Sequence, residues 1–296
     1  MQSVTDFPVA LDNVTLREAV PDDAERCGQI FYDAFASIAE RHNFPVEPGS
    51  PDFTQFKAAQ MLASDGFAAF VAEREGHVIA SAFADERGPI VGIGPVTVDP
   101  LAQDGGVGRR LVSAVLERER TRGVAGVRLV QTAYHYRSLA LYAKLGFVVR
   151  ETLSVMQGEP PALSVAGRGV RRAVPEDLEA CAEVCLRVHG HERTAELSDA
   201  IAAGSAAIVE RPDRISGYAS GFGYGWHAVA ETNEDLIALL GSAEAFIGLG
   251  ILVPARNAEL LRWCLDNGLK IVQQSTLMTI GLYNEPAGAY LPSILF

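Results

Sequence analysis

The stretch Gln103-Asp-Gly-Gly-Val-Gly-Arg-Arg110 decides how the rest of the chain is interpreted. It follows an apolar run at residues 90–98 and precedes a helical pattern that extends to about residue 122. Glycines between a strand and a helix let the backbone approach an anion closely, and the free N–H groups at the helix start attract phosphate oxygens. Arg109 and Arg110 add positive charge. The stretch therefore predicts a loop that holds a phosphate group.

Two nucleotide-binding loops of other classes do not fit this stretch. A Walker A loop ends in Gly-Lys-Ser/Thr, and the chain contains no such triplet. A dinucleotide fingerprint belongs to a parallel strand–helix–strand unit near a first strand, whereas this loop follows strands that we expect to be antiparallel. A glycine-rich stretch by itself more often forms only a turn. Whether this one binds a phosphate therefore depends on the segments around it.

The segments around the loop predict a domain of alternating strands and helices. We expect strands at residues 14–20, 67–73, 77–84, 90–98, 127–133 and 147–156, and helices at 22–41, 55–63, 106–122 and 138–145. The turn Arg74-Glu-Gly-His77 predicts a hairpin, because glycine permits a tight reversal.

The chain also contains an internal repeat. The stretch Arg17-Glu-Ala-Val-Pro-Asp-Asp-Ala-Glu-Arg-Cys27 resembles Arg171-Arg-Ala-Val-Pro-Glu-Asp-Leu-Glu-Ala-Cys181, which lies 154 positions later. Leu141-Tyr-Ala-Lys-Leu-Gly-Phe147 resembles Trp263-Cys-Leu-Asp-Asn-Gly-Leu269, which lies only 122 positions later. The second copy is therefore shorter by 32 residues. We expect it to lack the long strand before the glycine-rich loop and the loop itself.

Proline and glycine at residues 157–169 predict a linker between the two copies. In the second copy we expect strands at residues 170–174, 206–210, 215–224, 245–253 and 270–281, and helices at 175–188, 192–203, 233–240 and 258–267. The predicted domains are residues 1–156 and 170–296.

Two motifs of the first copy resemble those of the GNAT acyltransferases. The family's pyrophosphate loop, Q/R-x-x-G-x-G/A, is matched by Gln103-Asp-Gly-Gly-Val-Gly108, after the strand pattern Val96-Thr-Val-Asp-Pro100. A later family segment, N-x-x-A-x-x-L-Y-x-x-x-G-F, is matched by residues 135–147, His-Tyr-Arg-Ser-Leu-Ala-Leu-Tyr-Ala-Lys-Leu-Gly-Phe. The resemblance covers residues 14–158 strongly and 170–283 weakly. It implies an α/β (α+β) fold of two tandem GNAT-like domains, each a mixed, mostly antiparallel sheet flanked by helices.

The same resemblance implies acetyl-CoA, or another acyl-CoA, as cosubstrate, with no metal. The pantetheine arm would pair with one strand, and the pyrophosphate would lie on the N–H groups of residues 104–109. Tyr142 would be the general acid toward the departing thiolate, since a phenol of pKa about 10 can protonate it within hydrogen-bond reach. The implied cofactor-binding residues are Val96, Thr97, Val98, Gln103, Asp104, Gly105, Gly106, Val107, Gly108, Arg109, His135 and Ser138.

The chain departs from the family pattern at one place. The family's asparagine, which contacts the cofactor, is His135 here; an imidazole can also donate a hydrogen bond, so its role stays open. The second copy has Asn257 at the equivalent place but Cys264 in place of Tyr142, and it has no glycine-rich loop. We therefore expect the second copy to bind no acyl-CoA.

The sequence leaves the general base open. Candidates are Glu40, His42, Asp85, Glu86, Tyr134 and His135. The apolar stretch at residues 290–296 is expected to dock on a core or on the interface between the copies; the alternative is that the carboxylate of Phe296 acts as the base. His189 and His191 flank an expected helix end, where a cationic histidine is favoured, and we expect no ligand role for them.

Composition and charge narrow the function classes. The net charge of −12 opposes binding to nucleic acid or to an anionic membrane, and residues 151–296 are the more acidic half. Cys27, Cys181, Cys185 and Cys264 form no C-x-x-C pair, which indicates a reduced protein with neither a disulfide framework nor a zinc site. Cys181 and Cys185 are expected on the core face of a helix. The first residues show no signal sequence, and we expect a cytoplasmic protein.

Together these features predict an N-acyltransferase that moves acetyl from acetyl-CoA to a primary amine of a small molecule or peptide, in a ternary complex. The acidic surface favours a cationic acceptor such as a polyamine, an aminoglycoside or a lysine side chain. The alternative is a non-catalytic acyl-CoA sensor or scaffold, with an oxidoreductase a distant third. A homodimer is compatible with either function.

Overall fold

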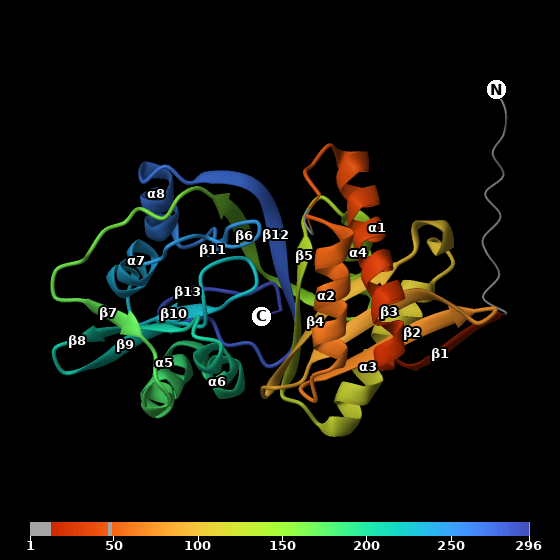
Figure 1. Ribbon diagram of the computed structural model, residues 1–296, viewed down its shortest axis with the longest axis horizontal. Coiled ribbons are helices and arrows are strands. Elements are labelled where there is room, and N and C mark those ends of the chain that lie inside the picture. The colour runs from red at the N-terminus through yellow and green to blue at the C-terminus, as the bar shows by residue number, and fades with distance from the viewer. Residues whose placement is uncertain (1–12, 47–48, 296) are drawn as a thin grey trace. The chain divides into compact units, whose positions relative to one another are not determined.

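The computed structural model describes residues 13–46 and 49–295 (Figure 1). The chain divides into two compact units. The first contains the described residues up to Asp85 together with Ile93–Gly123, and the second contains Glu86–Gly92 together with the chain from Val124 onward. Strand β4 (Ile90–Val98) therefore gives its first three residues to the second unit and the rest to the first.

The sheet of the first unit is an antiparallel meander. It runs in the order β1 (Val14–Glu18), β2 (Phe67–Arg74), β3 (His77–Asp85) and β4. Glu75 and Gly76 connect β2 to β3, and both have positive φ angles, 52° and 77°. Positive φ angles at both central residues are typical of a two-residue hairpin turn, because the twist of that turn matches the twist of the two strands it joins. The predicted hairpin is thus confirmed.

Helices cover both faces of this meander (Figure 1). Helices α1 (Ala24–His42) and α2 (Pro51–Leu62) pack on one face and α3 (Val107–Arg122) packs on β2 and β3. Neighbouring residues of a strand point to opposite faces. Val71 and Ala72 of β2 are both fully buried, so neither face is open to water there. The core under α1 and α2 contains Cys27, Ile30, Ala58, Met61, Val71, Val78 and Phe83.

The second unit contains a strand exchange between the two sequence copies. Strands β5 (Gly126–Thr132) and β6 (Val148–Gln157) come from the first copy, and β11 (Ile251–Pro254) and β12 (Lys270–Gly281) come from the second. The order is β5-β12-β6-β11, so β12 lies between the two strands of the first copy. β6 in turn pairs with β11. The last strand of the second copy therefore lies inside the sheet of the first, and the last strand of the first copy pairs with β11 of the second, which the sequence did not predict.

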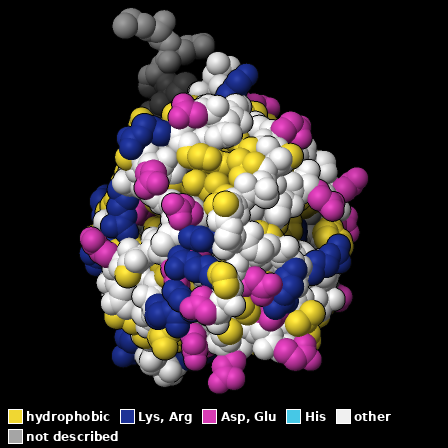
Figure 2. All heavy atoms as spheres, turned by 90° about the vertical axis from the view of Figure 1, so that its left-hand side faces the viewer, with side chains coloured by type: hydrophobic (Ala, Val, Ile, Leu, Met, Phe, Trp, Pro, Cys, Tyr) yellow, Lys and Arg dark blue, Asp and Glu magenta, His cyan; other side chains and the backbone are white. Residues whose placement is uncertain are grey.

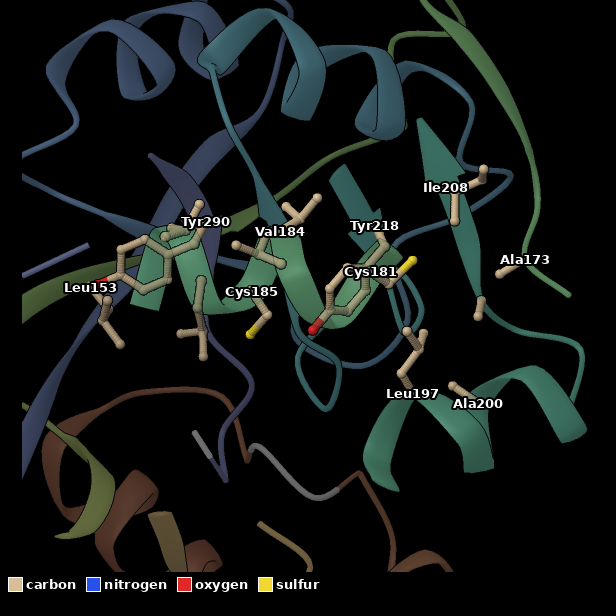
Figure 3. Packing of buried hydrophobic residues seen from close by; sticks show 14 of the residues in the cluster. Leu153, Ala173, Cys181, Val184, Cys185, Leu197, Ala200, Ile208, Tyr218 and Tyr290 are labelled. Carbon is tan, nitrogen blue, oxygen red and sulfur yellow. The ribbon is translucent and has the colours of Figure 1, made fainter. Parts of the chain in front are cut away.

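A second sheet of this unit has the order β13-β10-β9-β8-β7. Its core lies on both faces: Ile208 packs with helix α5 (Leu178–His189), and the next residue, Val209, packs with helix α7 (Asn233–Gly241). Figure 3 shows Cys181 and Cys185 of α5 among the core side chains. Both thiols are fully buried, which confirms their expected place on a core face. The strands are β7 (Gly169–Arg172), β8 (Ala207–Arg211), β9 (Arg214–Ala219), β10 (Ala228–Ala230) and β13 (Ala289–Leu291).

The second copy retains one strand that the sequence analysis expected it to lack. The third meander strand, expected to be missing, survives as the three-residue strand β10, which pairs with β9. β9 ends at Ala219, five residues before the predicted end, and the chain beyond it forms an isolated parallel bridge between Gly223 and Ile247. The remaining helices are α4 (Tyr136–Lys144), α6 (Thr194–Ala202) and α8 (Ala258–Asp266).

The repeat is visible as a shared ion pair at the start of each copy. Arg17 binds Asp23 through two hydrogen bonds of 2.7 and 2.8 Å, and Arg171 binds Asp177 through two bonds of the same lengths. These hydrogen bonds from arginine hold the pKa of each carboxyl below its ordinary value. Each aspartate also accepts the N–H of the valine three residues before it, so the pair ties a strand to the start of a helix.

Charges of both signs mix on the surface. Figure 2 shows basic and acidic side chains interspersed over the face that it presents. Glu231, for example, lies within ion-pair distance of Arg187, Arg211 and Arg214. The net charge of −12 is therefore not gathered into one acidic patch on that face. Among the described residues, no helix has the length and apolar character needed to cross a membrane.

Candidate acyl-donor site

The first group of predicted site residues lies on the end of β4. Thr97 is buried, and its Oγ1 lies 3.0 Å from Oγ of Ser81 on β3. Val96 and Val98 are half-buried on the same strand. The carbonyl of Val98 accepts a hydrogen bond of 3.2 Å from the side-chain amide of Gln103. Gln103 therefore ties the loop back to the strand that precedes it.

The loop itself adopts a conformation suited to anion binding. Asp104 and Gly106 have positive φ angles of 69° and 75°, and Gly106 is the N-terminal cap of α3. The helix's own hydrogen bonds begin with Arg110 N–H, which donates to the Gly106 carbonyl at 3.2 Å. The N–H groups of Val107, Gly108 and Arg109 therefore precede the helical ladder. Gly105 is buried within the loop, and Arg109 is exposed.

The charge at the start of α3 also suits an anion. The first turn of α3 carries no acidic side chain, although acidic residues are common in first turns because they complement the helix dipole. The first turns of α1, α5 and α7 each carry at least one. The positive end of the α3 helix dipole is therefore not offset by a carboxylate in its own first turn, which favours an anionic ligand there.

An ion pair fixes the corner between β4 and the loop. Asp99 accepts the N–H of Leu101 at 2.9 Å and binds Arg26 of α1. Arg26 is a positioning residue that the sequence did not single out. The two residues are 73 positions apart, and no local pattern connects them.

The second group of predicted residues belongs to the second unit. His135 is the N-terminal cap residue of α4, and Ser138 follows in the first turn. The Ser138 hydroxyl lies within hydrogen-bond distance of Gln131 Oε1 (3.0 Å) and of the His135 carbonyl (2.8 Å). Ser138 therefore fixes the start of α4 against β5.

Tyr142 is buried on the inner face of α4. Its ring meets Phe147 edge to face at 5.7 Å between centroids. Burial raises the pKa of the Tyr142 hydroxyl to about 12. The phenol is therefore neutral at physiological pH and has a proton to donate.

The second copy places different groups at the equivalent positions. Asn257 caps α8 with backbone angles of −78° and 72°, close to the −87° and 71° of His135. Its side chain accepts the N–H of Leu260 and exchanges hydrogen bonds with Asn233. Cys264 occupies the place of Tyr142, and burial raises the pKa of its thiol to about 12. The backbone conformation of the two helix starts is thus nearly the same, but the second copy has an amide and a thiol where the first has an imidazole and a phenol.

The helix start equivalent to that of α3 is capped by the protein's own side chain, since the Thr232 hydroxyl accepts the N–H of Asp235 at 3.3 Å. In the second copy, β10 leads within two residues to α7, whose first turn contains Glu234 and the fully buried Asp235. Asp235 accepts hydrogen bonds from Arg168, Arg211, Ser216 and Thr232. Unlike α3, α7 therefore has a side-chain cap and an acidic first turn at its N-terminus.

The predicted bases differ in exposure. Asp85, the last residue of β3, is 8% exposed, whereas Glu86 is half-buried and Glu40 is exposed. His42, Tyr134 and His135 are half-buried. The predicted alternative at Phe296 lies outside the described residues.

The histidines of the α5 end are buried and neutral, so the expectation of cationic histidines there is wrong. Nε2 of His189 lies 3.1 Å from Nε2 of His227, and His191 stacks on His189 at 5.7 Å. Burial lowers the pKa of His191 to about 4 and that of His189 and His227 well below 6.5. Tertiary packing has therefore overridden the helix-end effect. Among the residues that the structure describes, no group of three or more His, Cys, Asp or Glu could hold a metal ion.

Comparison with known proteins agrees with this geometry. Residues 31–147 match the acetyltransferase (GNAT) family. A mycothiol acetyltransferase from Amycolatopsis mediterranei is 32% identical over 158 residues, 49% of this chain and 50% of that protein. One from Thermomonospora curvata is 37% identical over 152 residues, 51% of this chain and 49% of that protein. The chain thus matches about half the length of these curated relatives.

A solved structure shares the fold along most of the chain. A protein from Pyrococcus horikoshii superposes with a TM-score of 0.70 over 95% of both chains at 21% sequence identity. At this identity the likeness concerns the fold alone. Together with the family match, the glycine-rich loop at the start of α3 and the buried tyrosine of α4 lead to one conclusion: this chain contains a domain of the GNAT acetyltransferase family.

Proposed function

We propose that the protein is an acetyl-CoA-dependent N-acetyltransferase that acts on a primary amine of a small molecule or peptide. The observation that carries this proposal is the start of α3. There the N–H groups of Val107, Gly108 and Arg109 precede the helical ladder, and the first turn contains no carboxylate. Such a terminus binds phosphate oxygens. The family match at residues 31–147 and the mycothiol acetyltransferase relatives support the same reaction.

In this proposal the residues of the first unit hold the donor. Bound acetyl-CoA supplies an acyl thioester that a neutral amine can attack directly. The N–H groups of Val107, Gly108 and Arg109 bind the pyrophosphate, with Gln103 fixing the loop. The backbone of β4 at Val96–Val98 pairs with the pantetheine arm, and the Ser81–Thr97 contact keeps that part of the strand in place.

Tyr142 gives its proton to the departing sulfur. A phenol with a pKa of about 12 is a weak acid for a thiolate of ordinary pKa about 8.5. Burial, however, raises thiol pKa values as well: the pKa of Cys27 lies at about 11 and that of Cys264 at about 12 in this protein. A leaving thiolate in an equally dry place would match the phenol. For the base we favour Asp85 among the predicted candidates, because it is the buried carboxylate of the set.

Replacement of Tyr142 by phenylalanine tests the mechanism. We expect Tyr142→Phe to lower kcat by roughly 10²- to 10⁴-fold, the range for loss of a general acid, with little change in the Kd for acetyl-CoA. Tyr136→Phe is the matched control, because Tyr136 lies on the same helix and is 70% exposed. Steady-state transfer to a panel of amines and a calorimetric titration give the two quantities. Equal kcat in the wild type and Tyr142→Phe would remove the acid from the mechanism.

The alternative is a non-catalytic acyl-CoA sensor, which the histidine in place of the family's asparagine favours. The same experiment separates the two functions. A wild-type protein that binds acetyl-CoA but transfers acetyl to no amine would be a sensor.

A further inference from the structure

In the first copy, strand β4 keeps one edge free over most of its length. Its first residues, Ile90, Val91 and Gly92, pair with β5. Among the residues that the structure describes, Ile93–Val98 has no paired strand on that side, while β3 lies on the other. In the proposed function the pantetheine arm pairs with this free edge at Val96–Val98.

In the second copy, strand β13 fills the corresponding place. β10 precedes α7 as β4 precedes α3, and β11 precedes α8 as β5 precedes α4. β13 pairs antiparallel with β10, from Ala228 opposite Leu291 to Ala230 opposite Ala289, and it also contacts β11. β13 therefore lies between the equivalents of β4 and β5, all within the second unit (Figure 1).

Both faces of β13 are buried, and its three residues are 2–4% exposed. Tyr290 packs with the core that contains Cys185 of α5 (Figure 3). Its neighbours Ala289 and Leu291 pack with the core on the α7 side. The place that β13 fills is thus closely fitted to it on both sides of the sheet.

The chain after β13 is also held in place. The N–H of Ile294 donates to the carbonyl of Tyr224 at 2.9 Å. A Cβ atom at Gly92 would stand 2.3 Å from the carbonyl oxygen of Leu295, so the glycine leaves the room that the chain needs there. Contacts thus hold the chain from residue 289 to residue 295.

We propose that the donor slot of the second copy has become a binding slot for an extended peptide, and that the C-terminal segment of this chain is its occupant. The equivalence to a donor slot rests on the proposed function. A pantetheine arm and a peptide both offer amide N–H and C=O groups, so one strand edge suits either. A peptide carries no phosphate group to be held, and the second copy has no glycine-rich loop.

The slot has the two parts that recognition of an extended peptide requires. A strand that adds to a sheet edge is held by main-chain hydrogen bonds, and pockets for alternate side chains select its sequence. Here β10 supplies the edge, and the core beside α5 supplies the pocket for Tyr290.

The test cuts the chain just before this segment. Glu285 is exposed, and a protease site inserted after it leaves residues 286–296 in the slot without a covalent link. A fluorescent peptide of the same sequence is added to the native cut protein, and its uptake is followed by fluorescence anisotropy. The uncut insertion variant is the control, because its slot stays filled by the tethered segment.

We expect the cut protein to take up one labelled peptide per chain and the uncut protein to take up none. An unlabelled peptide with Tyr290→Ala should compete about 100-fold or more weakly than the native sequence, because it loses a buried aromatic side chain. A peptide with Ala287→Ser is the matched control and should compete like the native sequence, because Ala287 is exposed.

Equal competition by the Tyr290→Ala peptide, or equal uptake by the uncut protein, overturns the inference. If the native cut protein takes up no label, it is unfolded and refolded with the labelled peptide present. No uptake after refolding shows that the segment is an inseparable part of the core, and the inference is then wrong. The Kd for acetyl-CoA is measured on the same uncut protein, and absence of binding there overturns the proposed function while peptide uptake still supports the slot.

Discussion

Tyr142 on α4 and Cys264 on α8 occupy equivalent positions of the two copies, in similar surroundings but with different side chains. The two side chains follow the same helix position in the two copies, and burial gives both a pKa of about 12. The backbone around them also repeats, since Phe147 N–H bonds to the Tyr142 carbonyl and Leu269 N–H to the Cys264 carbonyl, both at 3.0 Å. Burial and backbone are therefore alike at the two positions. The difference lies in the side chain, a long phenol in the first copy and a short thiol in the second.

The buried histidines predict acid sensitivity. The pKa of His191 in the folded protein is about 4, below its ordinary value of 6.5, so the unfolded chain binds a proton in this range and the folded chain does not. The free energy of unfolding should fall as the pH drops from about 6.5 toward about 4. His191→Gln should flatten this slope, by at most about 3 kcal/mol at pH 4. Urea unfolding at pH 7, 5.5 and 4 measures it.

His77→Gln serves as the control, because His77 is exposed at the start of β3. We expect it to keep the wild-type slope. An equal slope in the wild type and His191→Gln would show that this imidazole is not held neutral by the fold.

At the scale of elements, helix α3 offers a matched pair of glycines. Gly106 begins the helix with φ 75° and Gly123 ends it with φ 70°. An alanine at either place is strained by about 1–2 kcal/mol, so both variants should lose similar stability in urea. Only Gly106→Ala should also weaken acetyl-CoA binding, because only that end is proposed to hold the pyrophosphate. Equal Kd values for the two variants in a calorimetric titration would contradict the donor site.

The pairing of β12 with β5 and β6 joins strands from both copies, so neither copy can form it alone. The register of β12 runs from Ser275 opposite Thr132 to Gly281 opposite Gly126 on one side, and β12 pairs with β6 on the other. A central strand cannot leave without exposing both neighbours' N–H and C=O groups. The exchange therefore locks the first copy's sheet to the second copy.

At the scale of the whole molecule, this lock predicts how a cut chain behaves. A protease site inserted in the linker at residues 157–169 would divide the chain between β6 and β7. We expect the two pieces to elute together in size-exclusion chromatography and to separate only in denaturant, since β6 and β12 cross between them. The uncut insertion variant is the control. Separation in native buffer would rule out the exchange.

The two unequal copies also predict the number of donor sites. One acetyl-CoA should bind per chain, because the second copy has no glycine-rich loop before α7 and its helix start has a Thr232 cap and an acidic first turn. The stoichiometry of a calorimetric titration measures this directly. Two equivalents per chain would show that the second copy binds the donor as well.

Local patterns determined much of this protein. The spacing of apolar residues predicted most strands and helices within a few residues, as with β4 at residues 90–98 and β12 at 270–281. Glycine at 103–110 predicted the loop at the start of α3, since a left-handed residue at Gly106 is a local requirement. These features depend on neighbours along the chain, which the sequence displays.

Only the tertiary structure decided the features that join distant residues. The residues of β12 do not by themselves select β5 of the first copy over β11 of its own, so its partner depends on how the whole chain packs. The neutral state of His191 depends on burial, and the place of Pro292–Leu295 depends on a glycine two hundred residues away. Sequence fixes periodicity and turn chemistry; long-range pairing and desolvation arise only when the chain is folded.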